Sequence, residues 1–230
     1  MRAMCFTYAF IALTFGGLGS ANAVTSVCFG TIAKGRLEDG VKLPSEGKNF
    51  TPNSTLGVTL GRTYVHSKVS EIVLEAYRRM EVSVPNKVFV YGETGWVTGG
   101  RIRPHRTHQN GLSVDFMVPI VDDSGRSVPL PAGPNNKFGY NLEFDVNGKY
   151  DVYAIDFEAI AEHLYQLNIA GHARGVVITR VIFDPPYLPK LLATKHGDYL
   201  KANVSFMKGK AWVRHDEHYH VDFAVPCRPL

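Results

Sequence analysis

Two short segments in which apolar and polar residues alternate constrain this fold more than any other feature of the sequence. Residues 111–119 read GLSVDFMVP, and residues 218–223 read HYHVDF. Because successive side chains of a β-strand point to opposite faces, each segment forms a strand with one apolar and one polar face. If the two strands are neighbours, Asp115 shares its polar face with His218 and His220. The sequence therefore predicts a sheet that carries a cluster of ionisable groups on one side.

Two further histidines, His105 and His108, lie in the loop that leads into the first strand, where they can fold over the same face. Zinc binds neutral imidazole and carboxylate groups, and a catalytic zinc site keeps three protein ligands and one open position for water. Four histidines and one carboxylate exceed what a closed structural site needs, so the surplus favours catalysis. Because zinc lowers the pKa of a bound water to about 7, a neighbouring imidazole can take its proton at neutral pH.

The remaining apolar patterns indicate helices and strands without a regular β–α–β rhythm. Helical spacing of apolar residues predicts one helix over 66–80 and another that follows Asp156 as its N-cap. Apolar runs predict strands at 87–91 and 175–183, and a last strand within 211–225. We therefore expect an α+β fold with a mainly antiparallel central sheet, flanking helices and long loops around a zinc cleft.

Three other segments are less regular. Residues 29–62 are rich in Gly, Pro, Asn and Ser, which predicts an extended arm with a hairpin. Residues 121–150 hold several turn signals and predict a long excursion, of the kind that often forms a substrate wall or lid. Residues 187–200 are expected to be partly helical.

The first 23 residues have the layout of a secretory signal peptide, with Arg2, an apolar run and an A-x-A cleavage site that ends at Ala23. Cleavage leaves residues 24–230, which we expect to form a single zinc metallopeptidase domain in the periplasm or outside the cell. Export to an oxidising compartment favours a disulfide between Cys28 and Cys227. We expect no stable membrane insertion after cleavage. The chain also has no basic run of the kind that nucleic-acid binding needs.

The two histidine segments also resemble a known family. The pattern His105-x-x-His108-Gln-x-Gly-Leu-x-Val-Asp115, joined to His215-Asp-x-His218-x-His220, is similar to that of the penicillin-insensitive murein endopeptidases. These belong to a wider group with lysostaphin, the D-Ala-D-Ala metallopeptidases and the sonic hedgehog fold. Gly99-Gly100-Arg101 before the first segment matches the longer and more specific form of the pattern.

The resemblance implies roles for six residues. The zinc ligands would be His108, Asp115 and His220. The general base, or the group that stabilises the transition state, would be His218. His105 and His215 would line the site and contact the substrate. One departure is Ser113, which stands where family members often have Asp, so the support around the ligands is expected to differ.

The function implied is that of a zinc-dependent, penicillin-insensitive endopeptidase, which hydrolyses peptide cross-bridges of peptidoglycan with a zinc-activated water. Its partner would be the peptide stems of peptidoglycan. Three alternatives stay open at this point: a DD- or LD-carboxypeptidase of the same group, a non-catalytic wall-binding protein that contains zinc, and a secreted antibacterial effector with the same chemistry. The sequence leaves the preferred cross-link and the oligomeric state open.

Overall fold

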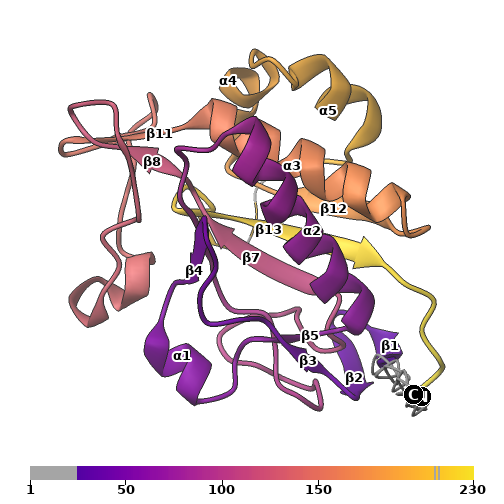
Figure 1. Cartoon of the computed structure of the whole chain (residues 1–230). Helices are drawn as coiled ribbons and strands as arrows, with labels where there is room; N and C mark the ends of the chain where they lie inside the picture. The colour runs from indigo at the N-terminus through magenta and orange to yellow at the C-terminus, as the bar shows by residue number, and fades with distance from the viewer. Residues whose placement is uncertain (1–24, 210, 212) are drawn as a thin grey trace, which may run out of the picture.

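The structure, a computed structural model, describes residues 25–209, 211 and 213–230. Its centre is a five-stranded sheet in the order β12-β13-β7-β6-β4 (Figure 1). Neighbouring strands are antiparallel except for the pair β6 and β4. The strands are β4 (Phe50–Pro52), β6 (Phe89–Tyr91), β7 (Ser113–Met117), β12 (Val177–Ile182) and β13 (His218–Ala224). The predicted α+β fold with a mainly antiparallel central sheet is therefore confirmed.

The two alternating segments are neighbouring strands, as predicted. In the antiparallel pair of β7 and β13, Asp115 lies opposite His220, and Phe116 lies opposite Tyr219. Because directly opposite residues point to the same side of a sheet, the first pair marks the polar face and the second pair marks the apolar face. This register alone brings residues more than 100 positions apart in the chain onto one surface.

Two long helices, α2 (Ser67–Ser83) and α3 (Phe157–His172), cover the apolar face of the sheet (Figure 1). The side chains of His66 and Asp156 cap them, accepting hydrogen bonds from the backbone N–H groups of Lys68 and Ala159. Both helices match the predicted segments. Further along the chain lie η2 (Pro185–Tyr187), α4 (Leu188–Leu192) and α5 (Gly197–Asn203), so the expectation of a partly helical 187–200 segment also holds.

Aromatic side chains fill the space between the helices and the sheet. Tyr77 of α2 stacks on Phe50 of β4 with ring centroids 4.4 Å apart. His163 of α3 meets Phe116 edge to face at 4.6 Å and shares a 2.5 Å hydrogen bond with the hydroxyl of Tyr219. Burial lowers the pKa of His163 to about 3, so this histidine is a neutral core residue. The opposite face of the sheet is thereby left for the ionisable cluster.

The N-terminal arm contains the expected hairpin, formed by β1 (Val27–Thr31) and β2 (Lys34–Glu38). A second small pair joins β3 (Val41–Lys42) to β5 (Tyr64–Val65). The short helix α1 (Thr55–Thr59) was not predicted. It is only five residues long and contains a glycine and three β-branched residues, so it has no helical pattern to detect.

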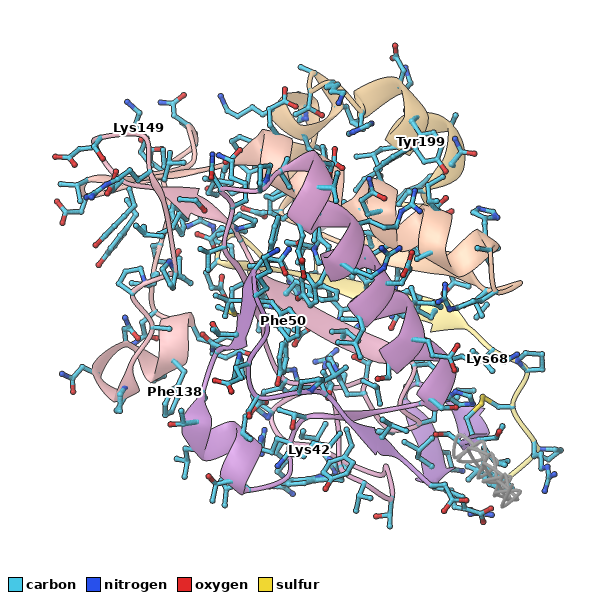
Figure 2. The ribbon with its side chains drawn as sticks, viewed as in Figure 1. Lys42, Phe50, Lys68, Phe138, Lys149 and Tyr199 are labelled. Atoms are coloured by element: carbon cyan, nitrogen blue, oxygen red, sulfur yellow. A yellow bond between two sulfur atoms is a disulfide. The ribbon has the colours of Figure 1, made fainter. Side chains whose placement is uncertain are left out.

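The excursion after β7 folds mainly into a small sheet of four short strands, in the order β10-β11-β8-β9. These are β8 (Ile120–Val121), β9 (Ser127–Val128), β10 (Lys149–Tyr150) and β11 (Tyr153–Ile155). The 3₁₀ segment η1 (Pro134–Gly139) lies between β9 and β10 and carries Phe138, which Figure 2 labels. Asn53 at the end of β4 donates a 2.9 Å hydrogen bond to the Phe138 carbonyl and so ties the excursion to the main sheet.

The predicted disulfide between Cys28 and Cys227 is present and joins β1 to the segment after β13 (Figure 2). The predicted signal peptide, residues 1–23, lies outside the described residues. Within the part of the chain that is described, no helix is both long enough and apolar enough to cross a membrane.

Replacing both cysteines by serine is expected to lower the free energy of unfolding of the protein by about 2–5 kcal/mol. The bridge joins residues 199 apart in the sequence, so it removes much of the conformational freedom of the unfolded chain. Denaturant titration of the Cys28→Ser/Cys227→Ser protein and the wild type measures the difference. Reductant should lower the unfolding midpoint of the wild type to that of the variant, and it should leave the midpoint of the variant unchanged. Equal midpoints before reduction would contradict this role of the bridge.

Candidate active site

A cleft of about 650 Å³ opens on the polar face of the sheet. The loop before β7, the start of β13 and the excursion all contribute to its walls. All six residues singled out from the sequence line it: His105, His108, Asp115, His215, His218 and His220. The fold therefore gathers these residues around one cavity.

Asp115 lies at the centre of the group and is buried. Its Oδ1 lies 2.7 Å from His220 Nδ1 and 3.3 Å from His108 Nε2. The loop after β6 supports it closely: the N–H of Gly92 donates to the Asp115 carbonyl at 2.7 Å, and a side chain at that glycine would meet Asp115 Cβ at 3.1 Å. Burial alone would raise the pKa of the Asp115 carboxyl, but His108 and His220 hold it well below its usual value.

His108 is held in an uncommon backbone conformation, with φ at 68°. Its Nδ1 lies 3.1 Å from the Thr94 carbonyl, so Nδ1 carries the proton in the neutral ring and Nε2 presents a lone pair toward Asp115. Both His108 Nε2 and Asp115 Oδ2 are buried and lack a hydrogen-bond partner among the described residues. Such unsatisfied polar atoms are costly, which is typical of ligand atoms directed at a cation.

His220 is fixed on both sides by carboxylates. Its Nε2 lies 2.7 Å from Asp222 Oδ1, opposite the nitrogen that faces Asp115. Asp222 in turn accepts from Ser113 Oγ at 2.6 Å and from Arg180 Nε at 2.8 Å. Burial would lower the pKa of His220, but Asp222 and Asp115 outweigh it and raise the pKa to about 9. Positive charge is therefore strongly favoured at this point of the cleft.

Ser113 thus has a defined task in this chain. Its hydroxyl donates to the carboxylate of Asp222, which orients His220. Asp222 was not singled out from the sequence, although it continues the alternation that places His218 and His220 on one face. Extending the alternation of this strand by two residues past His220 would have identified Asp222.

His105 lies at the edge of the group, between two carboxylates. Its Nε2 is 2.6 Å from Glu93 Oε2, and its Nδ1 is 3.5 Å from Asp115 Oδ2. The carboxylate of Glu93 also accepts hydrogen bonds from Nε and Nη2 of Arg62, at 2.5 and 2.6 Å. Burial would lower the pKa of His105, but the hydrogen bond that its ring donates to Glu93 and the nearby Asp115 raise it. Arg62 precedes β5 and Glu93 follows β6, in two loops without a motif of their own, so the sequence did not reveal them.

His218 and His215 stand side by side on the wall, with ring centroids 4.5 Å apart. His218 Nδ1 lies 2.8 Å from Glu217 Oε1, which leaves Nε2 as the nitrogen for the cleft. Burial lowers the pKa of His218 to about 4 and that of His215 to about 4. Burial also raises the pKa of Glu217 to about 7. Both imidazoles are therefore neutral at pH 7, and His218 can accept a proton.

Tyr140 from the excursion completes the wall. Its ring meets His218 edge-on at 5.5 Å and His105 at 6.3 Å. Burial, with help from the carboxylates of Asp115 and Glu93, raises the pKa of the phenol well above its usual value. The hydroxyl therefore stays protonated and can donate a hydrogen bond.

Two overlapping sets of residues have the donor atoms for a metal ion. Among the described residues, one ligand atom each from His105, His108 and Asp115 lie within 4.8 Å of one another. The second set is the one expected from the sequence, His108, Asp115 and His220, in which both histidines lie within 3.3 Å of Asp115 Oδ1. Either set joins imidazole nitrogen to carboxylate oxygen, which suits zinc.

Comparison with known proteins agrees with this arrangement. No curated protein matches the chain significantly. The family profile described as penicillin-insensitive murein endopeptidase matches residues 28–228, which include every strand and helix from β2 to β13 and all the residues of the cleft. The chain therefore belongs to the penicillin-insensitive murein endopeptidase family.

Proposed function

We propose that this protein is a zinc-dependent endopeptidase that hydrolyses peptide cross-bridges of peptidoglycan. The observation that carries the proposal is the pair of buried, unsatisfied atoms His108 Nε2 and Asp115 Oδ2 beside His220, on the wall of a cleft that also holds a neutral histidine. Family membership supplies the substrate class. The cleft, at about 650 Å³, has the size of a site for a peptide rather than for a lone ion.

His108, Asp115 and His220 are the proposed zinc ligands. The carboxylate of Asp222 on the far nitrogen of His220 matches the carboxylate–histidine pair that commonly orients a metal ligand. When bound there, zinc would polarise the scissile carbonyl and acidify a water. His108, Asp115 and His220 would hold the ion, and Ser113 and Arg180 hold Asp222 in place.

The remaining residues handle protons and the substrate. His218, oriented by Glu217, takes a proton from the attacking water through Nε2 and delivers it to the leaving amine. His215 donates through Nδ1 to the Val213 carbonyl at 2.9 Å, which fixes its ring beside His218. His105, anchored by Glu93, lies where it can contact the substrate carbonyl. Neutral imidazoles are required here, and burial provides them.

Insensitivity to penicillin is an expectation of the proposed reaction. A β-lactam inactivates an enzyme by acylating a nucleophilic side chain, and the proposed reaction forms no acyl-enzyme.

The proposal also includes a location. Residues 1–23 would direct the chain to the periplasm or the exterior, and residues 24–230 would act there as one domain. The Cys28–Cys227 disulfide agrees with an oxidising compartment.

The bond that is cut distinguishes the endopeptidase from the carboxypeptidase. Purified cross-linked muropeptide dimers are incubated with the mature, zinc-loaded protein, with and without penicillin, and the products are weighed by mass spectrometry. We expect the dimers to become monomers at the same rate in both samples. Stems that shorten by one terminal residue would show a carboxypeptidase instead. Intact dimers beside a folded, zinc-loaded protein would favour a wall-binding role.

The two possible ligand sets are separated by one pair of variants. His220→Gln is expected to lower zinc affinity by more than about 100-fold, because a ligand contributes more than the outer-shell partners whose loss costs about 10–100-fold. His105→Gln is expected to keep one zinc per protein. Zinc content after dialysis against a graded chelator series measures both. Loss of zinc from His105→Gln with retention in His220→Gln would reverse the assignment.

A further inference from the structure

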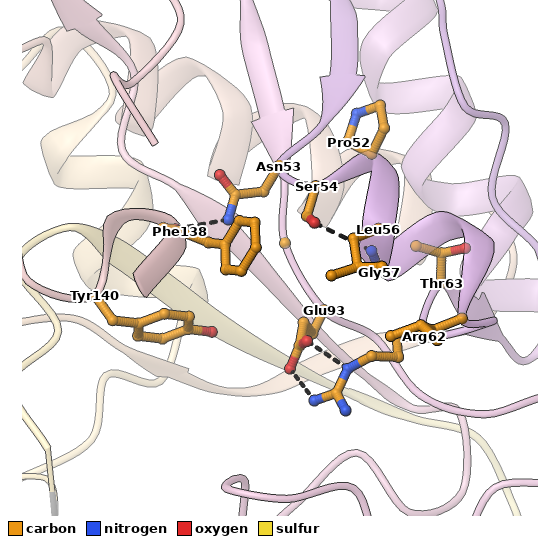
Figure 3. A pocket seen from close by; sticks show the side chains of 12 residues that line it. Pro52, Asn53, Ser54, Leu56, Gly57, Arg62, Thr63, Glu93, Phe138 and Tyr140 are labelled. Atoms are coloured by element: carbon orange, nitrogen blue, oxygen red, sulfur yellow. Dashed lines mark hydrogen bonds and ion pairs between the residues drawn. The ribbon is translucent and has the colours of Figure 1, made fainter. Parts of the chain in front are cut away.

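A second, smaller cavity adjoins the cleft and has no part in the chemistry proposed above. Its volume is about 180 Å³, slightly more than the roughly 150 Å³ that holds a benzene-sized molecule in an apolar cavity. It lies between α1 and η1 (Figure 3). Arg62, Glu93, Phe138 and Tyr140 line both cavities. A peptide in the cleft would therefore lie next to side chains that also line the smaller cavity.

The lining of the smaller cavity is apolar at its rim. Leu56 of α1 and Leu60, the residue that follows the helix, are 52% and 56% exposed, which is high for two leucines so close together. Figure 3 shows Leu56 and the ring of Phe138 facing one another across the cavity. Apolar side chains that are kept in contact with water beside an active site are typical of a binding surface.

Most polar side chains of the lining are already engaged, whereas the buried Thr63 Oγ1 has no hydrogen-bond partner among the described residues. Arg62 and Glu93 neutralise each other through two hydrogen bonds. Ser54 Oγ accepts from the backbone N–H of Gly57 at 3.1 Å, and Asn53 donates to the excursion. The cavity therefore selects a ligand by its size and by apolar contact, because its lining carries no net charge that would attract a carboxylate or an ammonium group.

The wall that closes this cavity is held in a costly conformation. Lys137 and Phe138 both have positive φ, at 51° and 57°, which non-glycine residues rarely adopt. Asn136 Oδ1 fixes the segment by accepting from the N–H groups of Gly133 and Gly139, at 2.8 and 3.0 Å. Backbone strain of this kind, which here positions the side chain of Phe138, is concentrated at functional sites.

We propose that this cavity is a specificity subsite for a small uncharged side chain of the peptide stem, of the alanine class, at a residue outside the scissile bond. The inference rests on the proposed endopeptidase function and deepens it. A benzene-sized apolar cavity fits a methyl group with its adjoining backbone and disfavours a charged side chain. Binding away from the reacting bond then favours long substrates over short ones.

Gly57 allows a direct test by filling the cavity. It is buried in the lining, and a Cβ there would meet only Ser54 Cβ and Oγ, at 3.6 and 3.8 Å. Gly57→Leu therefore adds a side chain at little cost to the backbone, and Leu56→Asp places a charge on the exposed rim. Thr59→Leu is the matched control, because it adds the same side chain to the same helix at an exposed residue outside the lining.

The quantity to measure is the ratio of kcat/KM for a cross-linked muropeptide dimer to kcat/KM for a dipeptide that contains only the scissile bond. We expect the ratio to fall by about tenfold or more in Gly57→Leu and Leu56→Asp, and to keep its wild-type value in Thr59→Leu. An unchanged ratio in both folded cavity variants would overturn the subsite and leave the endopeptidase function intact. A wild-type protein that cleaves neither substrate would overturn the function itself, and the subsite with it.

Discussion

Asp115→Asn is expected to remove zinc from the protein and to lower kcat/KM by at least about 10³-fold. Asn has the same shape but no charge, so the two histidines beside Asp115 Oδ1 lose the carboxylate that completes their ligand set. Metal-ion catalysis supplies several kcal/mol of transition-state stabilisation, and about 1.4 kcal/mol corresponds to a factor of ten in rate. Both candidate ligand sets contain Asp115, so this result does not depend on the choice between them.

The matched control for this experiment is His172→Asn, which removes an exposed histidine at the end of α3, outside the cleft. It should retain both zinc and activity. Metal content by mass spectrometry of the folded proteins, together with muropeptide turnover, gives the two readouts. An Asp115→Asn protein that keeps one zinc and most of its turnover would contradict the assignment of the metal centre.

His218→Gln is expected to lower kcat by about 10²–10⁴-fold while zinc content stays at the wild-type level. General acid–base catalysis contributes about this factor, and glutamine cannot take up a proton at neutral pH. The substitution removes the neutral imidazole that Glu217 orients, without touching a proposed ligand. KM should change little, because the lost interaction belongs to the transition state.

The pH profile gives a second readout for the same residue. Because burial lowers the pKa of His218 to about 4, its imidazole is neutral above that value and protonated below it. Activity of the wild type should therefore fall as the pH drops toward 4. The residual activity of the His218→Gln variant should not show this decrease toward pH 4. A variant with the same kcat as the wild type would exclude His218 as the proton carrier.

Much of the fold was predictable because the two strands at its centre have strict period-two alternation. Their apolar sides hold Phe116 and Tyr219 against the helices, so the polar sides of both strands must face the cleft. The same reasoning predicted that Asp115 would share a face with His218 and His220 if the strands were neighbours, and the register places it opposite His220. The long helices were predictable for an equivalent reason, since each has an apolar face, and Asp156 also marks the start of α3.

The rest depends on contacts that have no local signal. Glu93 reaches His105 because the loop after β6 is hydrogen-bonded to the backbone of Asp115, and Tyr140 reaches His218 only through the excursion. The five residues of α1 take their helical form from the Ser54 cap and their surroundings rather than from periodicity. The smaller cavity arises between α1 and η1, two elements that the sequence does not reveal.

The most direct test of the central claim is the digestion of intact peptidoglycan sacculi by the mature protein, with the released muropeptides weighed by mass spectrometry. Three samples are compared: zinc-loaded protein, protein treated with chelator, and chelator-treated protein to which zinc is restored. The account predicts loss of cross-linked dimers in the first sample, none in the second, and recovery in the third. Cleavage that persists in the folded, zinc-free protein, or dimers that stay intact in all three samples, would contradict it.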